Sequence, residues 1–261
     1  SFSLASILGV PFSIYLAMKF NWHAPFVFLG CISFGLYFFI FKYVPPRAVL
    51  ESGKSSTILE PLLEVMRSRN LAMGLVFMIF LFLGQFTVIP FISPTLVANA
   101  GLPEVHLPLI YLCGGLTSIV SAPMIGRFSD RIGKHKIFIF GAILSIVPIY
   151  LLTHLGPTSV PLILAISSLF FVSMSMRMIP AMALISGAPT PERRGSYMSL
   201  VSSVQSLSSA LGSSLAGYII IRDNITGHMD HYQTVGYIAI VFTVLSVVVV
   251  KYVKHTTSSP V

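Results

Sequence analysis

Long apolar runs, each about the length of a membrane-spanning helix, follow one another along almost the entire chain. Hydropathy separates eight of them, which cover Phe2–Met18, Pro25–Phe41, Leu71–Val97, Leu107–Ile125, Ile137–Thr153, Val160–Ile185, Met198–Ile221 and Val235–Tyr252. About 20 residues of helix cross roughly 30 Å of hydrocarbon. Charged residues make up only 9% of the chain, against about 25% in a soluble domain. The chain therefore lacks the polar surface that a soluble protein needs.

The secondary structure of these runs follows from the lack of water in lipid. Only helices and closed barrels satisfy every backbone hydrogen bond there. The runs are too long and too uniformly apolar for barrel strands, in which apolar and polar residues alternate. The sequence predicts an all-α membrane protein with about eight transmembrane helices.

The placement of Lys and Arg predicts the orientation of these helices. One side of the membrane collects thirteen of them: Lys42, Arg47, Lys54, Arg67, Arg69, Arg127, Arg131, Lys134, Lys136, Arg193, Arg194, Lys251 and Lys254. The other side has only Lys19 and Arg222. Basic residues accumulate on the cytoplasmic side, so both ends of this chain are expected to be cytoplasmic. An even number of spans requires the same result.

Composition argues against several other classes of protein. The net charge of +8 comes from basic residues that flank apolar runs, which does not favour nucleic-acid binding. Cys31 and Cys113 lie within apolar runs and are interpreted as packing residues. His228 to His231 lie in a polar segment with too few ligands for a metal site. We therefore expect no metal, no cofactor and no catalytic residues.

The longest polar connection divides the chain. Between Lys42 and Asn70 lie two prolines, a glycine and a Ser-Ser-Thr cluster, which is typical of a linker. We predict two helices in residues 1–44, a cytoplasmic linker in 45–69 and a six-helix bundle in 70–261. Because Ser1 already lies in an apolar run, we also expect that the N-terminal part of a longer protein is missing from this chain.

A short charged run, Gly126–Lys136, separates two of the apolar runs and carries a family resemblance. It resembles the conserved loop of the major facilitator superfamily, a glycine followed by Asp-Arg, then Gly and two basic residues. The matching positions are Gly126, Asp130, Arg131, Gly133, Lys134 and Lys136, with His135 as a departure.

Two further runs resemble branches of that superfamily. Gly9-Val10-Pro11, followed by Trp22, resembles the fifth helix of drug:proton antiporters, although the usual glycine pair is absent. Pro191–Gly195, which leads to Ser199–Gln205, is similar to the tenth loop of bacterial arabinose-efflux-like permeases.

The resemblance implies a partial transporter of major facilitator type that contains helices five to twelve. It implies alternating access, with proton-coupled efflux of a small organic solute, a drug or a sugar, across a bacterial inner membrane. Its partners would be the solute, protons and the lipid bilayer. The absent N-terminal helices, or a second chain, would be needed to complete the cavity.

The charged run is interpreted as a conformational latch formed by Gly126, Asp130, Arg131, Gly133 and Lys134. A carboxylate is stabilised near the positive N-terminus of a helix, and the helix that begins near Gly195 is the candidate partner of Asp130. The alternative is a loop whose basic residues only set the orientation of the helices.

Arg177 lies within an otherwise apolar run. An arginine there costs about 2.5–3.5 kcal/mol on insertion scales and should face a cavity or a partner. Pro180 cannot donate to the C=O of Met176, which leaves one free acceptor nearby. We interpret Arg177 as a substrate-binding or proton-coupling residue. The alternative is a side chain that snorkels to the headgroups.

Other polar or helix-breaking residues also lie at membrane depth. Gln85 and Gln205 are predicted to orient a polar ligand, and hydrogen bonds between helices would explain them equally well. Pro90 and Pro94 interrupt one run, and broken helices often form gates in transporters. A static kink is the alternative.

Two other functions remain open from the residues alone. A membrane scaffold, a sensor or a degenerate half-transporter would tolerate replacement of Arg177. A membrane-embedded transferase would need a His/Asp or carboxylate cluster at one membrane face, and His228–His231 is the nearest candidate.

Overall fold

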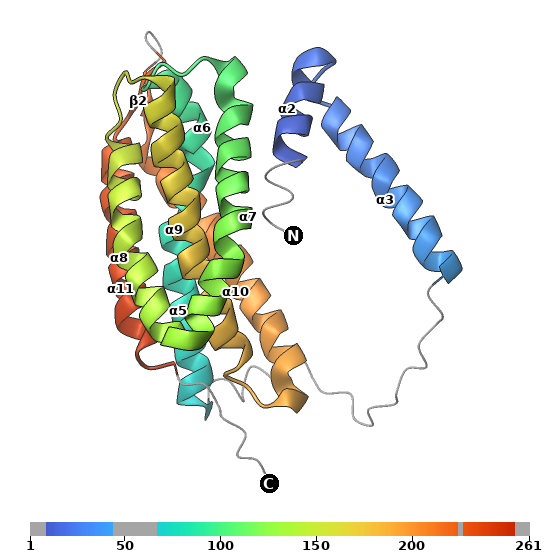
Figure 1. The fold of residues 1–261 in the computed structure, drawn as a ribbon, viewed down its shortest axis with the longest axis vertical. Coiled ribbons are helices and arrows are strands. Elements are labelled where there is room, and N and C mark those ends of the chain that lie inside the picture. Colours follow the sequence, from blue (N-terminus) through green and yellow to red (C-terminus); the bar gives the residue numbers. More distant parts are fainter. Residues whose placement is uncertain (1–8, 44–66, 224–226, 254–261) are drawn as a thin grey trace.

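The computed structural model describes residues 9–43, 67–223 and 227–253, and these are almost entirely helical (Figure 1). The elements in chain order are α2 (Val10–Lys19), α3 (Ala24–Tyr43), α5 (Arg69–Phe86), α6 (Ile89–Ala98), a 3-10 turn (Glu104–His106), α7 (Leu107–Ile132), α8 (Lys134–Thr153), α9 (Val160–Ser186), a second 3-10 turn (Pro191–Arg193), α10 (Arg194–Ile219), β1 (Ile221–Arg222), β2 (Met229–Asp230) and α11 (Tyr232–Val250). The two short strands pair antiparallel as a hairpin.

Helices α5 to α11 form one bundle, in which some packed neighbours run antiparallel, such as α8 and α9, and others parallel, such as α7 and α9. α9 packs between α7 and α8, while α10 and α11 pack on α5, and α11 also packs on α8. α2 contacts α7, and α3 stands apart from the bundle with no buried residue (Figure 1). Most of the predicted linker, residues 45–69, lies outside the described residues, so the domain division stays a prediction.

Six helices in the described part of the chain are long and apolar enough to cross a membrane, which confirms the prediction of a helical membrane protein. They span Ala24–Tyr43, Arg69–Ala98, Glu104–Ile132, Lys134–Thr153, Val160–Ser186 and Tyr232–Val250.

Two of the eight expected spans are not among these six. The first, Phe2–Met18, lies partly outside the described residues, and its described part is the 10-residue α2. The other corresponds to α10, which is a continuous helix of 26 residues. α10 is long enough to cross the bilayer, but its apolar character is diluted by serines at positions 196, 199, 202, 203, 206, 208, 209, 213 and 214.

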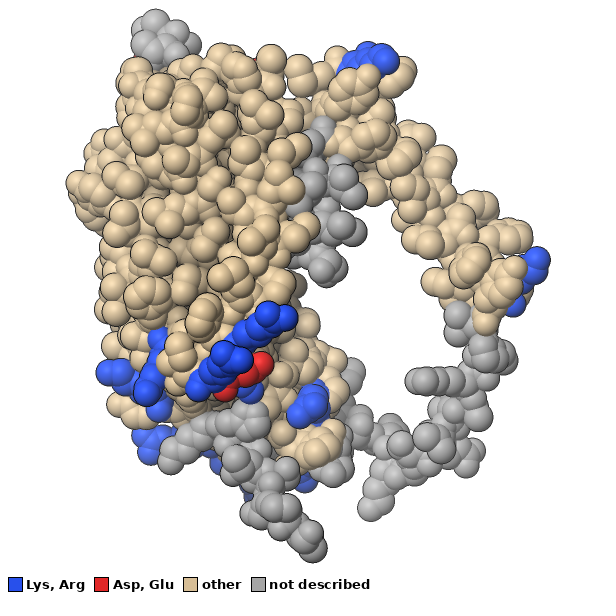
Figure 2. Space-filling view, in the orientation of Figure 1, with Lys and Arg blue, Asp and Glu red and all other residues tan. Residues whose placement is uncertain are grey.

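The bundle has two chemically different ends. At the basic end, α7 ends at Ile132 and α8, α5 and α10 begin with Lys134, Arg69 and Arg194. Figure 2 shows Lys and Arg side chains gathered at this end. At the hairpin end lie β1, β2 and the start of α11 (Figure 1).

Buried apolar side chains form one cluster toward each end. The hairpin-end cluster includes Ile92, Ile163 and Val235. The basic-end cluster includes Phe77, Phe138 and Leu184. Polar side chains that lie between these two clusters, at membrane depth, are therefore candidates for a functional role.

Candidate functional site

A layer of buried polar side chains separates the two apolar clusters. In α9, for example, the hairpin-end cluster reaches Phe171 and the basic-end cluster resumes at Ala181. Five helices contribute to this polar middle layer, with side chains at most 3% exposed: Gln85, Ser145, Ser173, Arg177, Ser208, Thr243 and Ser246. Polar and charged side chains inside a membrane bundle are costly to insert and commonly mark functional sites. We therefore take this layer as the candidate site.

Arg177 is the charged member of the layer. Its side chain is 1% exposed, and its Nη1 donates a hydrogen bond of 3.0 Å to the Thr243 Oγ1 of α11. Its Nε has no hydrogen-bond partner among the described residues. The guanidinium therefore faces the inside of the bundle, which argues against the snorkelling interpretation. It lines neither of the two cavities at the hairpin end.

The hydroxyl groups of the layer are arranged as acceptors. Thr243 donates to Ala239 O at 2.8 Å, and Ser246 donates to Thr243 O at 2.6 Å. Ser145 likewise donates to Ala142 O of its own helix. Because the hydroxyl hydrogens are engaged within the helices, the oxygens can only accept further bonds. Such oxygens stabilise a cation, and no acidic side chain that the structure describes belongs to the layer.

Gln85 lies in the same layer as Arg177. Its side chain is 2% exposed, and its Oε1 has no hydrogen-bond partner among the described residues. The preceding residue, Gly84, allows α5 to approach α11, since a Cβ there would lie 3.1 Å from Ala239 O and 3.4 Å from Thr243 N. Gln85, whose Oε1 is an unpaired acceptor among the described residues, therefore directly follows the point at which α5 approaches α11 most closely in this layer.

The third predicted site residue, Gln205, lies elsewhere. Its side chain is only partly buried, and its Nε2 lies 3.5 Å from the Met182 Sδ of α9. It borders an exposed polar face of α10 that includes Ser199, Ser202 and Ser206. These serines donate to the carbonyl oxygens four residues earlier in the helix. Arg177 and Gln85 are therefore both buried inside the bundle, whereas Gln205 is only partly buried.

The predicted charged loop is largely helical, which corrects the expectation of a loop over Gly126–Lys136. α7 continues to Ile132, and α8 begins at Lys134. A helix whose backbone is already satisfied continues past the hydrocarbon, and its charged side chains then lie in the aqueous boundary. Only Gly133 turns the chain, with a φ of 111° that favours glycine.

Within the predicted latch, Asp130 and Arg131 are exposed. Figure 2 shows an acidic side chain among the basic ones at this end. Among the described residues the Asp130 carboxylate makes no ion pair within 4 Å, and its expected interaction with the N-terminus of α10 stays a prediction. A Cβ at Gly126 would meet no atom within 4 Å. His135, the departure from the family pattern, places Nε2 2.8 Å from Val253 O after α11.

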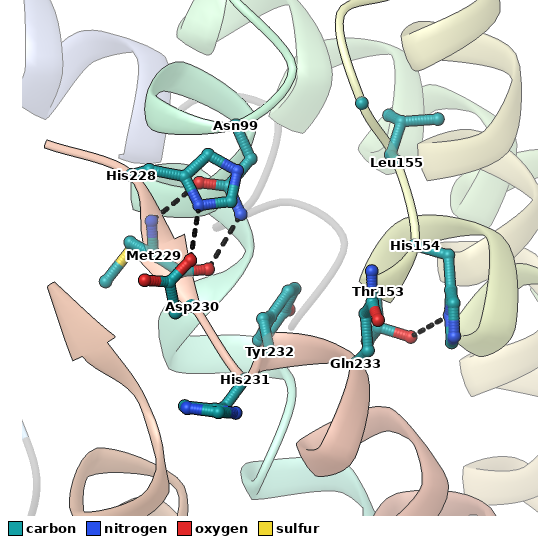
Figure 3. A pocket seen from close by; sticks show the side chains of 11 residues that line it. Asn99, Thr153, His154, Leu155, His228, Met229, Asp230, His231, Tyr232 and Gln233 are labelled. Carbon is teal, nitrogen blue, oxygen red and sulfur yellow. Dashed lines mark hydrogen bonds and ion pairs between the residues drawn. The ribbon is translucent and has the colours of Figure 1, made fainter. Parts of the chain in front are cut away.

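The hairpin end holds a second group of polar side chains, around a cavity of about 400 Å³ (Figure 3). His228 Nδ1 lies 2.9 Å from Asp230 Oδ1, and His154 contacts Tyr237 Oη at 3.0 Å through Nε2. No group of three or more His, Cys, Asp or Glu side chains among the described residues could hold a metal ion.

Sequence reasoning missed Thr243, Ser145 and Ser246. Each is a single small hydroxyl residue in an apolar run, which is common in membrane helices and usually reflects packing. Their spacing on α8 and α11 carried no signal, because only the fold shows which helix faces they share with Arg177.

Comparison with known proteins gives a consistent family. The family description "Major Facilitator Superfamily" matches residues 1–121 and 78–260. The uncharacterized MFS-type transporter YbcL of Bacillus subtilis is 24% identical over 222 residues, covering 84% of this chain and 55% of the relative. The lincomycin resistance protein LmrB of Listeria monocytogenes is 23% identical over 231 residues, covering 87% and 47%.

A third relative, named a probable sugar efflux transporter of Helicobacter pylori, is 24% identical over 151 residues, covering 58% of this chain and 37% of the relative. The chain thus spans about half the length of the curated relatives that it matches.

Proposed function

We propose that this chain, which belongs to the Major Facilitator Superfamily, is part of a secondary active transporter that exports a small organic solute in exchange for protons. The family and the names of the relatives, one for lincomycin resistance and one for sugar efflux, support this direction. A small solute recognised by neutral hydrogen-bonding groups fits the polar side chains that the described helices carry at membrane depth.

The buried guanidinium of Arg177 carries the proposal. A charge at this depth costs free energy on insertion, and intramembrane charges serve transport or coupling in most known cases. Because Arg177 is buried and hydrogen-bonded to Thr243, and lines neither hairpin-end cavity, we assign it to coupling. Its positive charge would disfavour protonation of a nearby carrier group, which the rest of the protein would supply.

The two glutamines take separate parts in this proposal. Gln85 is a second acceptor in the polar middle layer and would pair with Arg177, directly or through water, when the bundle rearranges. Gln205 borders the exposed serine face of α10 and would orient the solute there. Under this proposal that face and α3 are covered by the helices absent from this chain or by a second chain.

The basic end is proposed to be cytoplasmic, in the inner membrane of a bacterium, so that both ends of this chain lie in the cytoplasm. Gly126, Asp130, Arg131, Gly133 and Lys134 would form the latch that holds this side closed. As Asp130 is exposed and without an ion pair to a described residue, its partner would come from the absent part of the protein.

A substitution in the latch tests this assignment. Asp130→Asn keeps the shape of the side chain but removes the charge, and it should lower the turnover of transport without changing the amount of inserted protein. Glu104→Gln, which removes an exposed carboxylate at the hairpin end, is the control and should leave turnover unchanged. If the wild type, Asp130→Asn and Glu104→Gln all have the same turnover, the charged run Gly126–Lys136 only sets the orientation of the helices in the membrane.

The proposal as a whole is tested with the complete open reading frame in inverted vesicles. A panel of dyes, sugars and amino acids is added with and without a proton gradient. Flux that depends on the gradient and disappears with a protonophore is the expected result. Folded, inserted protein that moves no compound would favour a scaffold or sensor.

A further inference from the structure

The cavity of about 400 Å³ at the hairpin end is lined by none of the residues that form the polar middle layer. The ends of α6 and α8, strand β2 and the start of α11 surround it and contribute Asn99, Thr153, Met229 and Gln233 (Figure 3). Sites for small molecules occupy about 300–1,000 Å³. The cavity is therefore large enough to hold a small ligand of its own.

The wall of the cavity that β2 forms is held in place by hydrogen bonds. Asn99 donates from Nδ2 to Met229 O at 2.9 Å and accepts from Met229 N at 2.8 Å at its Oδ1. Met229 pairs in turn with Arg222 of β1. At the start of α11, the Tyr232 hydroxyl donates to Val88 O at 3.2 Å. A wall that is ordered before a ligand arrives lowers the conformational cost of binding.

The α8 wall of the cavity also uses its polar groups within the protein. Thr153 donates from its hydroxyl to Ile149 O at 2.9 Å. The His154 Nδ1 lies 2.9 Å from Tyr150 O, and the His154 Nε2 lies 3.0 Å from Tyr237 Oη. Because these groups are already hydrogen-bonded, the recognition of a polar ligand depends on the side chains of β2 and α11.

Two side chains from β2 and α11 retain free hydrogen-bonding groups in the cavity. Asp230 Oδ1 lies 2.9 Å from His228 Nδ1, and Asp230 Oδ2 has no hydrogen-bond partner among the described residues. The exposed Gln233 side chain likewise makes no hydrogen bond to a described residue. In Figure 3, Asp230 and Gln233 lie on different sides of Tyr232. The carboxylate only accepts hydrogen bonds, whereas the amide both donates and accepts them.

A compound with several hydroxyl groups matches these two side chains better than an ion does. Each hydroxyl donates one hydrogen bond and accepts others, so it suits both the Asp230 carboxylate and the Gln233 amide. An anion would be repelled by Asp230, and an organic cation would face a carboxylate that His228 already contacts. A metal ion would need more ligands, and no group of three or more His, Cys, Asp or Glu side chains in the described part of the chain could hold one.

We propose that this cavity binds a polyol, with one hydroxyl that donates to Asp230 and others that exchange hydrogen bonds with the Gln233 amide. Two sources offer this chemistry at a membrane surface. One is a free polyol such as a sugar, and the other is the glycerol headgroup of phosphatidylglycerol. The site is additional to the transport site of the proposed function, and its occupancy does not require transport.

The test measures the protection of a reporter inside the cavity in the full-length protein. Leu155→Cys, at a half-buried position that lines the cavity, is introduced in a background without other cysteines. Its labelling by a membrane-impermeant maleimide is followed in phosphatidylserine nanodiscs with increasing glucose, galactose or glycerol, and in phosphatidylglycerol nanodiscs without them.

The two kinds of nanodisc distinguish the two sources. Saturable slowing of the labelling by a soluble compound identifies a free polyol. Slower labelling in phosphatidylglycerol than in phosphatidylserine, an anionic lipid without headgroup hydroxyls, identifies the lipid. If no soluble compound slows the labelling and the two lipids give equal rates, the site is overturned.

Two substitutions test the recognition itself. Gln233→Leu keeps the size of the side chain but removes the amide, and Asp230→Asn removes the charged acceptor. Each is expected to raise the half-saturating concentration of the polyol about tenfold, or to abolish the difference between the two lipids. Thr234→Val, an exposed neighbour that does not line the cavity, is the control and should change neither.

The labelling rate without a ligand shows whether the cavity is intact in each variant. This matters for Asp230→Asn, which also alters the contact with His228, and Gln233→Leu leaves that contact in place. Protection that persists undiminished in both variants would overturn the assignment of Asp230 and Gln233.

The labelling needs no proton gradient, so its outcome is independent of the proposed function. Protection at Leu155→Cys in a protein that moves no compound would support the polyol site and reject the transporter. Gradient-driven flux without protection by any of these probes would keep the transporter and reject the polyol site.

Discussion

The polar middle layer and the two apolar clusters on either side of it are equally buried but are held together differently. In the clusters, glycines let the helices approach closely, as Gly74 does where a Cβ would lie 3.1 Å from the Ile185 Cδ1. In the layer, the charged side chain of Arg177 in α9 donates a hydrogen bond to the Thr243 hydroxyl of α11. The clusters gain from contact area, while the layer gains from hydrogen bonds.

The difference shows where stability and function reside in this bundle. Lipid is as apolar as a leucine side chain, so helices in a membrane associate through close packing and hydrogen bonds. The clusters supply that packing without any buried charge. Arg177 raises the free-energy cost of inserting α9 into the membrane, and close packing does not need such a residue. We therefore expect the function to depend on the polar middle layer.

The largest effect on stability is expected at Thr243, because it is the hydrogen-bond partner of the buried charge. Thr243→Val keeps the shape but leaves the Arg177 Nη1 without an acceptor, which should cost about 2–3 kcal/mol. Thr234→Val, an exposed threonine near the start of the same helix, is the control. Denaturation of the purified protein measures both. A Thr243→Val protein as stable as the wild type would remove the distinction between layer and clusters.

A somewhat smaller effect is expected in the hairpin-end cluster. A Cβ at Gly114 would collide with the ring of Phe171, and overpacking of this kind costs about 1–3 kcal/mol. Gly114→Ala should therefore lower the melting temperature while transport per folded molecule is retained. Gly195→Ala, where a Cβ would meet no atom within 4 Å, should change neither. Lost transport in folded Gly114→Ala protein would contradict the division of roles.

The smallest effect is expected outside both regions, at the turn between α7 and α8. Gly133 has a φ of 111°, and a residue with a Cβ there is strained by about 1 kcal/mol. Gly133→Ala should be slightly less stable than Gly126→Ala, since Gly126 lies in a regular helix with open space around it. Thermal unfolding of the two variants in parallel measures this. A less stable Gly126→Ala would show that the turn geometry is not what requires glycine.

The sequence predicted the positions of the membrane helices well, because length and hydropathy are physical requirements of the bilayer. It placed their ends less well, since α7 continues through charged residues to Ile132. It also placed α10 as an apolar span, although the serines make it more polar than its neighbours. Hydropathy measures the average along a helix and says nothing of which face the polar groups occupy.

For the candidate site, the sequence identified Arg177 because a charge in an apolar run is rare. It did not identify Thr243, because a threonine in such a run is common. Gln85 and Gln205 looked equivalent in the sequence. Only the rotation of α5 and α10 in the bundle makes the first buried and the second partly exposed. Helix rotation comes from packing, which hydropathy does not specify.

The most direct test of the account is to measure flux and stability together for Arg177→Met in the full-length protein, with the exposed Arg69→Met as control. Replacing an arginine in a membrane span with an apolar side chain of similar size removes an insertion cost of about 2.5–3.5 kcal/mol. We expect Arg177→Met to be at least as stable as the wild type, and its gradient-driven flux to fall to background. Undiminished flux in a folded Arg177→Met protein would contradict the assignment of function to the polar middle layer.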